Sequence, residues 1–447
     1  MNGLLIRNVE IEGRSGLDVL IEGGLISAIG EGLSGAGDVL DGRGGALIPG
    51  LIDHHIHLFA TAAAEASLDL QDCVDSDEVV RRIAGACANL APGEWLRAIR
   101  LPVAIAQSMN RDMLDHAGVD RPVRVLDRTG ALWILNSHAL RIVGEDSAEL
   151  EHDDNGRATG RLWRGDAWLR YRTGSVTPSL AALGQKLAAL GITGVTDASA
   201  GNDAAAARLL AASLPQRVLA MSRSRIEGAP GPVKILLDER NLPPFDDLVA
   251  WISEARRWHR PVAVHCVTAA ELGLVLAAFQ DAGSHPGDRI EHGGVIPAPA
   301  IPEIAALGLR VVTQSNFIAA QGDRYLTDVD ATDRGDLYRC ATLIAAGIPV
   351  AGSSDAPYGS IDCWAAMKTA TTRRTHAGIV LGAKETVSPQ AALNLYLGAQ
   401  DDPGGTPRRV TPGAAADLCL LNTGLADALT RLSAANVAAT IIGGRVM

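Results

Sequence analysis

Aromatic side chains are scarce in this chain of 447 residues, at 4%, whereas glycine, with 48 residues, is abundant. Small side chains favour closely packed α/β architecture over an aromatic-rich core. The hydrophobic fraction of 47% and charged fraction of 20% are those of a soluble globular protein. The length is sufficient for a large barrel with a smaller satellite domain.

Positive charge is also in deficit, because 40 lysines and arginines face 51 aspartates and glutamates, a net charge of −11. Nucleic acids and anionic membranes are bound through basic patches, so this balance argues against both kinds of partner. No apolar run approaches the about 20 residues that a membrane helix needs. The first residues, MNGLLIRNVEIEG, lack the plan of a signal peptide, so we expect a cytoplasmic protein. We also expect a small-molecule substrate.

Closely spaced cysteines are absent, and no C-x-x-C pair occurs. The scattered spacing predicts free thiols in a reducing compartment rather than a disulfide framework or a thiolate zinc site. The six cysteines are Cys73, Cys87, Cys266, Cys340, Cys363 and Cys419.

Both ends of the chain consist of short β-prone runs separated by glycine turns. Near the N-terminus, Gly23-Gly24 predicts a hairpin turn. Residues 416–422 and 437–447 have the same texture. We therefore expect one composite β-sandwich domain, built from residues 1–48 and 408–447.

The middle of the chain, residues 49–407, alternates strand-like apolar runs with helical runs such as 244–259 and 268–283. This alternation is typical of parallel strands joined by helices, and eight strands predict a (β/α)₈ TIM barrel. The candidate strands are 47–58, 194–199, 217–223, 233–239, 262–267, 289–294, 310–316 and 349–357.

An insertion separates the first candidate strand from the second. Residues 60–190 are far more than one crossover needs. They include a helix with Ser76 as its N-cap and a strand at 122–127. Long loops at the carboxyl end of a barrel define substrates in many enzymes, so we expect a lid or pocket wall.

The first candidate strand carries the motif His55-Ile56-His57 at its end. Side chains alternate along a strand, so His55 and His57 should share one face, and His54 should face away from His55. Two imidazoles on one face can form half of a metal site, although a histidine-rich turn with ordinary hydrogen bonds is the alternative.

Four more ionisable residues lie at the ends of later strands, where barrel enzymes place their chemistry. The residues are Lys234, His265, His292 and Asp355. Taken alone, Lys234 could be a strand-end lysine, His265 a core histidine and Asp355 a helix cap. Their joint order along the strands is much harder to obtain by chance.

Five motifs in this order resemble the metal-dependent amidohydrolase superfamily: PGLIDHHIHL, VKILLDE, VAVHC, RIEHGG and SSDAPYG. Within it the chain is most similar to the group of N-substituted formamide deformylases and exoenzyme-regulator-like amidohydrolases, through DRPVRV, LWILNSHAL, DDNGRATGRLW and GITGVTDAS. The resemblance extends nearly end to end, and it is compatible with a homodimer.

The resemblance implies a binuclear centre with two divalent metal ions, for which zinc is expected. His55, His57 and Asp355 would bind one metal, and His265 and His292 the other. Lys234, as N6-carboxylysine, would bridge them, since a carbamate is an anionic oxygen donor and an ammonium is not. A metal-bridging hydroxide would be the nucleophile, with Asp355 as general acid and base, cleaving an amide-like C–N bond.

The substrate side departs from the resembled group. Gly130 stands where a histidine is common in that group, and Arg128 is a candidate to replace it. Further candidate substrate-binding residues are Trp133 and Asn136, and, for an anionic substrate group, Arg223 and Arg225. A core tryptophan and a surface arginine pair are the structural alternatives.

Other activities stay open at this point. Ester, lactone or phosphoester hydrolysis could use the same centre. A mononuclear deaminase would usually carry H-x-x-E after the fifth strand, where this chain has His265-Cys266-Val267-Thr268. A non-enzymatic descendant would have lost ligands, and all six positions are present here.

Overall fold

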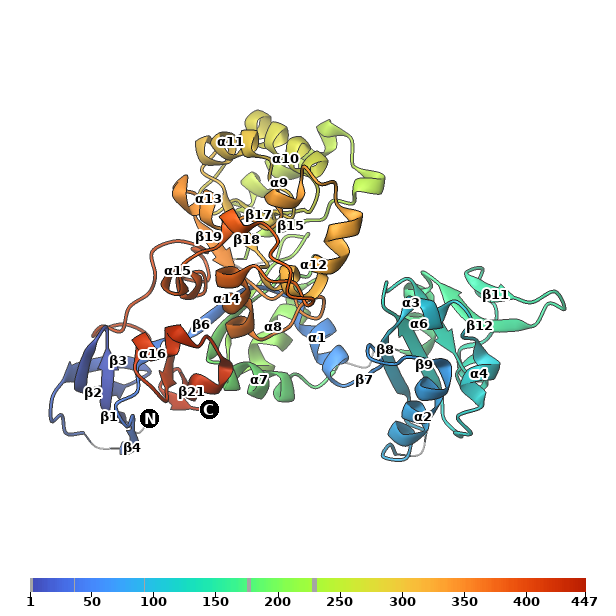
Figure 1. Cartoon of the computed structure of the whole chain (residues 1–447), viewed down its shortest axis with the longest axis horizontal. Coiled ribbons are helices and arrows are strands. Elements are labelled where there is room, and N and C mark those ends of the chain that lie inside the picture. Colours follow the sequence, from blue (N-terminus) through green and yellow to red (C-terminus); the bar gives the residue numbers. More distant parts are fainter. Residues whose placement is uncertain (1–2, 36, 92, 175–177, 227–230) are drawn as a thin grey trace. The chain divides into compact units, whose positions relative to one another are not determined.

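The computed structural model describes residues 3–35, 37–91, 93–174, 178–226 and 231–447. The chain divides into two compact units, one made of Met1–Thr61 and Leu180–Met447 and the other of Ala62–Ser179 (Figure 1). Helix α1 (Leu58–Glu65) contains the boundary. Among the described residues, no helix has both the length and the apolar character needed to cross a membrane.

Eight of the described strands in the first unit form two parallel sheets, ordered β14-β13-β6 and β15-β16-β17-β18-β19. A parallel bridge between Ser222 and Val233 links the sheets at one edge. At the other edge the backbone N–H of Asp355 donates to the carbonyl of His55. This is a TIM-barrel-type α/β fold. The strands are β6 (Leu51–Ile56), β13 (Ile192–Asp197), β14 (Arg217–Ala220), β15 (Val233–Ile235), β16 (Val262–Cys266), β17 (Arg289–His292), β18 (Arg310–Thr313) and β19 (Val350–Gly352).

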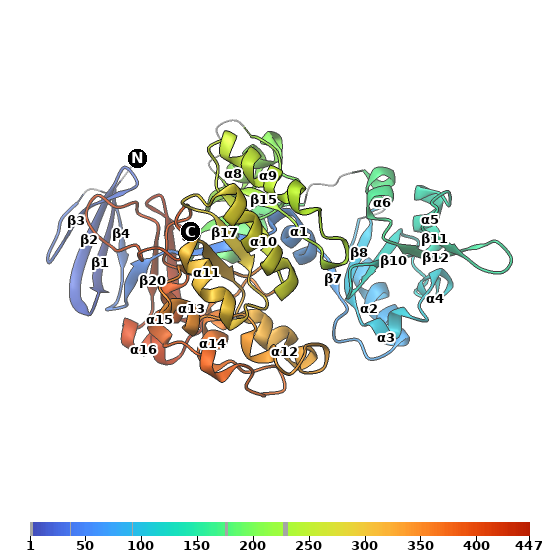
Figure 2. The ribbon, with the colours of Figure 1, turned by 90° about the horizontal axis from the view of Figure 1, so that it is seen from above.

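Helices between these strands cover the outside of the parallel strands (Figure 2). Two of them correspond to the predicted runs 244–259 and 268–283, and the second begins with a capping box in which Thr268 and Glu271 satisfy each other's backbone N–H groups. The helices are α7 (Leu180–Ala189), α8 (Ala204–Ser213), α9 (Phe245–Arg257), α10 (Ala269–Ala282), α11 (Ile301–Ala306), α12 (Asn316–Asp328), α13 (Ala341–Ala345), α14 (Cys363–Thr372) and α15 (Pro389–Asn394).

Two four-stranded sheets come from the chain ends, ordered β3-β2-β1-β4 and β22-β21-β20-β5. Side chains from both sheets, including Ile6 and Leu418, form one hydrophobic cluster. The predicted hairpin turn at Gly23-Gly24 joins β2 to β3, and both glycines have positive φ, which disfavours other residues there. The strands are β1 (Gly3–Ile11), β2 (Arg14–Glu22), β3 (Leu25–Gly30), β4 (Gly37–Asp41), β5 (Leu47–Pro49), β20 (Leu418–Leu421), β21 (Val437–Ile442) and β22 (Arg445–Val446), and α16 (Leu425–Thr430) follows β20.

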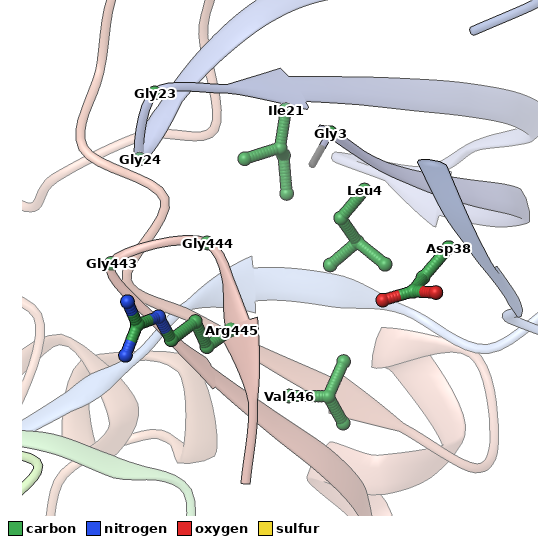
Figure 3. Close-up of a pocket in the computed structure, with 10 residues that line it drawn as sticks. All are labelled: Gly3, Leu4, Ile21, Gly23, Gly24, Asp38, Gly443, Gly444, Arg445 and Val446. Carbon is green, nitrogen blue, oxygen red and sulfur yellow. The ribbon is translucent and has the colours of Figure 1, made fainter. Parts of the chain in front are cut away.

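A pocket lies between these terminal sheets, beside the Gly23-Gly24 turn (Figure 3). Asp38 and Arg445 are its charged lining residues, and the others are glycine or aliphatic. Its lining includes no residue of the eight parallel strands and no histidine or cysteine. It is therefore separate from the predicted site.

The second unit is built on a six-stranded sheet, ordered β11-β12-β10-β9-β8-β7. Two hydrophobic clusters pack in this unit. One contains Val125 and Ile134, and the other contains Trp133 and Leu135. Helix α2 begins after Asp75, whose carboxylate accepts the N–H of Glu78, so the predicted cap Ser76 is instead the first helical residue. The elements are β7 (Leu68–Asp69), α2 (Ser76–Cys87), β8 (Leu96–Leu101), α3 (Val103–Ala106), α4 (Arg111–Asp115), β9 (Val123–Asp127), β10 (Leu132–Leu135), α5 (Ser137–Val143), β11 (Leu150–His152), β12 (Ala158–Trp163) and α6 (Asp166–Thr173).

Candidate metal centre

The two histidines of the H-x-H motif lie at the end of β6 and approach one carboxylate. Nε2 of His55 is 3.4 Å from Oδ1 of Asp355, and Nε2 of His57 is 3.3 Å from the same oxygen. Asp355 follows β19 and reaches the motif because its segment hydrogen-bonds to β6. One ligand atom from each of the three residues lies within 4.8 Å of the others, a spacing that fits one cation.

His265 and His292 lie beside this group, at the ends of the neighbouring strands β16 and β17. Their ring centroids are 4.4 Å apart, and the ring of His292 is 4.8 Å from that of His55. Lys234, on β15, is 1% exposed, and its Nζ has no hydrogen-bond partner among the described residues. Burial, and after it the charge of Lys234, lowers the pKa of both His55 and His265.

Backbone strain occurs at two of these residues. His292 has φ of 71° and Asp355 has φ of 50°. A side chain in this left-handed region costs roughly 1–2 kcal/mol, and such strain is concentrated at functional sites. Buried Asp53 helps to hold the arrangement, since its Oδ1 accepts the backbone N–H groups of His55 and Ser354 at 3.2 and 3.0 Å.

Three of the histidines have a partner at Nδ1. The Nδ1 of His55 contacts a carboxylate oxygen of Glu291. His57 Nδ1 lies 3.2 Å from the hydroxyl of Ser199, and His292 Nδ1 lies 2.9 Å from Oε1 of Gln314. A carboxylate or amide oxygen only accepts, so His55 and His292 carry their proton on Nδ1 and keep the Nε2 lone pair. This is the tautomer that a metal ligand needs.

Burial sets the protonation of the centre. Desolvation, reinforced by the charge of Lys234, lowers the pKa of His265 to about 4 and that of His55 well below 6.5. The pKa of His292 is also lowered, by burial and then by the neighbouring histidines. Burial also lowers the pKa of Lys234. Burial raises the pKa of Asp355, and the neighbouring His57 opposes that rise. The imidazoles of His55, His265 and His292 are thus neutral donors near pH 7.

These residues fit a divalent metal. His55 Nε2, Asp355 Oδ1 and Lys234 Nζ are buried without a hydrogen-bond partner within the described ranges. Leaving such atoms unsatisfied is costly, and a cation would satisfy the imidazole nitrogen and the carboxylate oxygen. Imidazole and carboxylate donors suit zinc, and also iron, nickel or manganese.

His54 does not belong to this group of ligands. It is fully buried, and neither ring nitrogen has a hydrogen-bond partner in the part of the chain that the structure describes. Burial, followed by the charge of Arg289, lowers the pKa of His54 from 6.5 to about 3. The structure makes it a core residue.

The buried His54 should make the protein sensitive to acid. Between pH 6.5 and about 3 the unfolded chain takes up a proton at His54 that the folded chain refuses. The free energy of unfolding is therefore unaffected by this proton above pH 6.5 and decreases as the pH falls toward 3, by about 5 kcal/mol in full. Urea unfolding of His54→Leu at pH 7 and pH 5 should show a smaller loss than the wild type at equal metal loading. Exposed His376→Leu is the control, and equal losses in all three proteins would contradict the prediction.

The candidate substrate residues in the second unit differ in their surroundings. Arg128 is exposed. Trp133 is buried, and its indole N–H donates to Asp166 at 2.8 Å. Asn136 is fully buried, caps α5 through the N–H of Ala139, and bonds the backbone of β9. Its side-chain oxygen and nitrogen are therefore already engaged.

The other two candidates follow β14 in the first unit. The guanidinium of Arg223 lies 4.6 Å from the ring centre of Trp251, a cation–π contact. Arg225 is exposed. Gly130, in the second unit, has φ of 75° with open space around its missing side chain, so it makes a turn that a histidine would strain.

Sequence reasoning missed the residues that hold the histidines, namely Ser199, Glu291 and Gln314. One signal was present for Glu291, because an acidic residue inside a strand as apolar as β17 needs a buried partner. Ser199 and Gln314 carry no such signal, since short polar residues are common where strands end.

The chain is similar to known proteins over most of its length. The amidohydrolase family matches residues 38–447. N-substituted formamide deformylase of Arthrobacter pascens is 25% identical over 470 residues, which cover 88% of this chain and 86% of that protein.

Two solved structures of uncharacterized metal-dependent hydrolases are similar in fold. That from Pyrococcus furiosus has a TM-score of 0.73 at 20% identity, covering 93% of this chain and 97% of its own. That from Pyrococcus horikoshii OT3 has a TM-score of 0.74 at 17% identity, covering 94% and 97%. At these identities the likeness concerns the fold.

Proposed function

Since the chain belongs to the amidohydrolase family, we propose that it hydrolyses the C–N bond of small N-formyl or related N-acyl amides. Metal-dependent hydrolysis of carbon–nitrogen bonds other than peptide bonds is the activity of this protein. The observation that supports metal-dependent hydrolysis is the approach of Asp355 Oδ1 to both His55 and His57. The deformylase relative favours a formyl or other small acyl group.

Apart from Lys234, the proposed metal ligands are four histidines and one aspartate, and they form two sets around a modified lysine. His55, His57 and Asp355 would hold one divalent metal, and His265 and His292 a second. Lys234, carboxylated on Nζ, would contribute to both, in keeping with its buried and unpartnered amine. When bound, such metals lower the pKa of water and polarise a carbonyl oxygen.

Asp355 moves the proton in this proposal. Its Oδ1 faces the two histidines, and burial raises the pKa of its carboxyl group. A carboxylate in this position accepts a proton from the attacking water and gives it to the departing amine nitrogen, which must be protonated to leave. Amide cleavage thus uses one group first as base and then as acid.

The substrate enters beside His57. The side chain of His57 is 21% exposed, whereas that of His55 is fully buried. Tyr358, which is 68% exposed, meets the ring of His57 edge-on at 5.9 Å. Tyr358 therefore marks the solvent side of the centre and is placed to contact the amine portion of a substrate.

Metal content is the first test. Protein grown with added zinc and bicarbonate and purified without chelator should contain close to two metal ions per chain by elemental analysis. A value near one would contradict the binuclear arrangement. A value near zero, with no gain of activity on adding metal, would contradict the proposed function.

A substrate panel tests the finer assignment. Equal concentrations of N-formyl, N-acetyl and N-benzoyl derivatives of one amine, with the matching formate ester, should give the highest kcat/KM for a small acyl amide. A preference for the ester that exceeds its greater rate of spontaneous hydrolysis would show that C–O rather than C–N cleavage is preferred, and would overturn the amide assignment.

A further inference from the structure

We infer that Glu291, held by Arg289, is a positioning residue for His55 and makes the set His55, His57 and Asp355 the tighter of the two metal sites. This inference rests on the proposed function, because it assumes that these residues bind metal. It assigns a role to a buried ion pair that does not itself provide a ligand.

Glu291 is completely buried, and both of its carboxylate oxygens are engaged. Oε1 accepts from Nε of Arg289 at 2.5 Å, and Oε2 contacts Nδ1 of His55. Arg289 is 1% exposed and also donates to the backbone carbonyl of His54 at 3.2 Å. The pair therefore connects the side chain of one ligand to the backbone beside it.

This arrangement fixes which nitrogen of His55 faces the centre. An ionised carboxylate only accepts hydrogen bonds, so His55 carries its proton on Nδ1 and presents the Nε2 lone pair toward Asp355. The guanidinium of Arg289 pairs with the carboxylate of Glu291 and restrains its rotation. With both oxygens occupied, the carboxylate of Glu291 is not available to a metal.

The hydrogen-bond partners at Nδ1 of His57 and His292 are neutral groups, and the nearest carboxylate oxygen to Nδ1 of His292, Oδ2 of Asp355, is 3.9 Å away, beyond hydrogen-bond distance. His57 meets the hydroxyl of Ser199, and His292 meets the amide oxygen of Gln314. A charged acceptor increases the basicity of the opposite ring nitrogen more than a neutral one does. His55 is thus the strongest imidazole donor of the three, and the metal that it binds should be held more tightly.

A purely structural role is the competing explanation, since any buried ion pair stabilises its surroundings. The chain offers a matched control in Glu385, a buried carboxylate that pairs with buried Arg339 at 2.7 Å. Its other hydrogen-bond partners are Cys340 and Thr342, which are not among the proposed ligands. Glu291→Gln and Glu385→Gln therefore remove the same charge from similar surroundings.

The experiment measures metal affinity directly, by titrating metal-depleted full-length protein with zinc against a competing chelator. In Glu291→Gln the tighter binding step should weaken about 10- to 100-fold, the usual cost of losing such a partner. The visible absorption of bound cobalt should also change, because it reports ligand geometry. Glu385→Gln should bind zinc and cobalt as the wild type does, even where its melting temperature falls.

A double variant, Arg289→Gln/Glu291→Gln, avoids leaving a lone buried charge and keeps the test valid where the single variant folds poorly. It should show the same weakening of the tighter step. Wild-type affinity in the double variant, or weakening confined to the looser step, would overturn the inference. If the wild type in that case still bound zinc and hydrolysed its substrate, the proposed function would stand. A wild type that bound no metal would contradict both the inference and the proposed function.

Discussion

Replacing Lys234 with alanine should lower kcat/KM about 1,000-fold, equivalent to roughly 4 kcal/mol of barrier, and reduce the metal content toward one ion per chain. The reason lies in the surroundings of the amine, which is buried and has no hydrogen-bond partner within the described part of the chain. An ammonium there would repel cations, and burial lowers the pKa of Lys234. The neutral amine can add to CO₂: an N–C bond forms, one N–H proton leaves to water, and the resulting carbamate oxygens can bind metal.

Rescue separates a lost ligand from a damaged fold. Lys234→Ala leaves a space next to the histidines, and a short carboxylic acid such as acetate or propionate can supply the missing anionic oxygens. Part of the activity and the second metal should return as the acid is added. Exposed Lys368→Ala is the control and should behave as the wild type. Full activity of Lys234→Ala without added acid would exclude the carbamate.

The proximity of the candidate ligands was predictable because these residues follow the periodicity of the fold. Side-chain alternation in β6 places His55 and His57 together, and parallel strands bring their carboxyl ends to one edge. Lys234, His265 and Asp355 each stand at or just beyond such an end. Local sequence and strand order therefore sufficed to bring these residues together without any knowledge of side-chain contacts.

The limits of the strands were less predictable. The sequence predicts strands at 233–239 and 349–357, but β15 ends at Ile235 and β19 at Gly352. Extended pairing stops where the chain turns toward the centre, and the positive φ of Asp355 is part of that turn. A β-prone sequence continues past this point, since propensity does not record where a functional site bends the backbone.

The second unit shows a different limit. Sequence analysis identified a helix and the strand at 122–127, whereas the structure has six strands in one sheet. Strands as short as β7 and β11 have too few residues for alternation to be visible. The bond from the backbone N–H of Val123 in β9 to the side chain of Asn136 is equally hidden, because the residue type alone does not indicate it.

Replacing Asp355 with asparagine should separate metal binding from proton transfer. The amide keeps one oxygen at nearly the same position, so the metal beside His55 and His57 should be retained with weakened affinity. The amide cannot accept a proton at neutral pH, so kcat should fall about 100- to 10,000-fold, the usual worth of a positioned general acid or base. Metal content and kcat are measured on the same preparation, with exposed Asp401→Asn as the control.

The comparison of the two losses identifies what Asp355 does. A large fall in kcat with metal retained assigns the carboxylate to proton transfer, because coordination alone survives in the amide. Equal loss of metal and rate would make Asp355 an anchor for the cation and leave the proton to another group. An unchanged rate would show that Asp355 is not the general base. Lys234→Ala would then decide whether metal is needed for the reaction, since losing the carbamate removes a metal ligand and leaves Asp355 untouched.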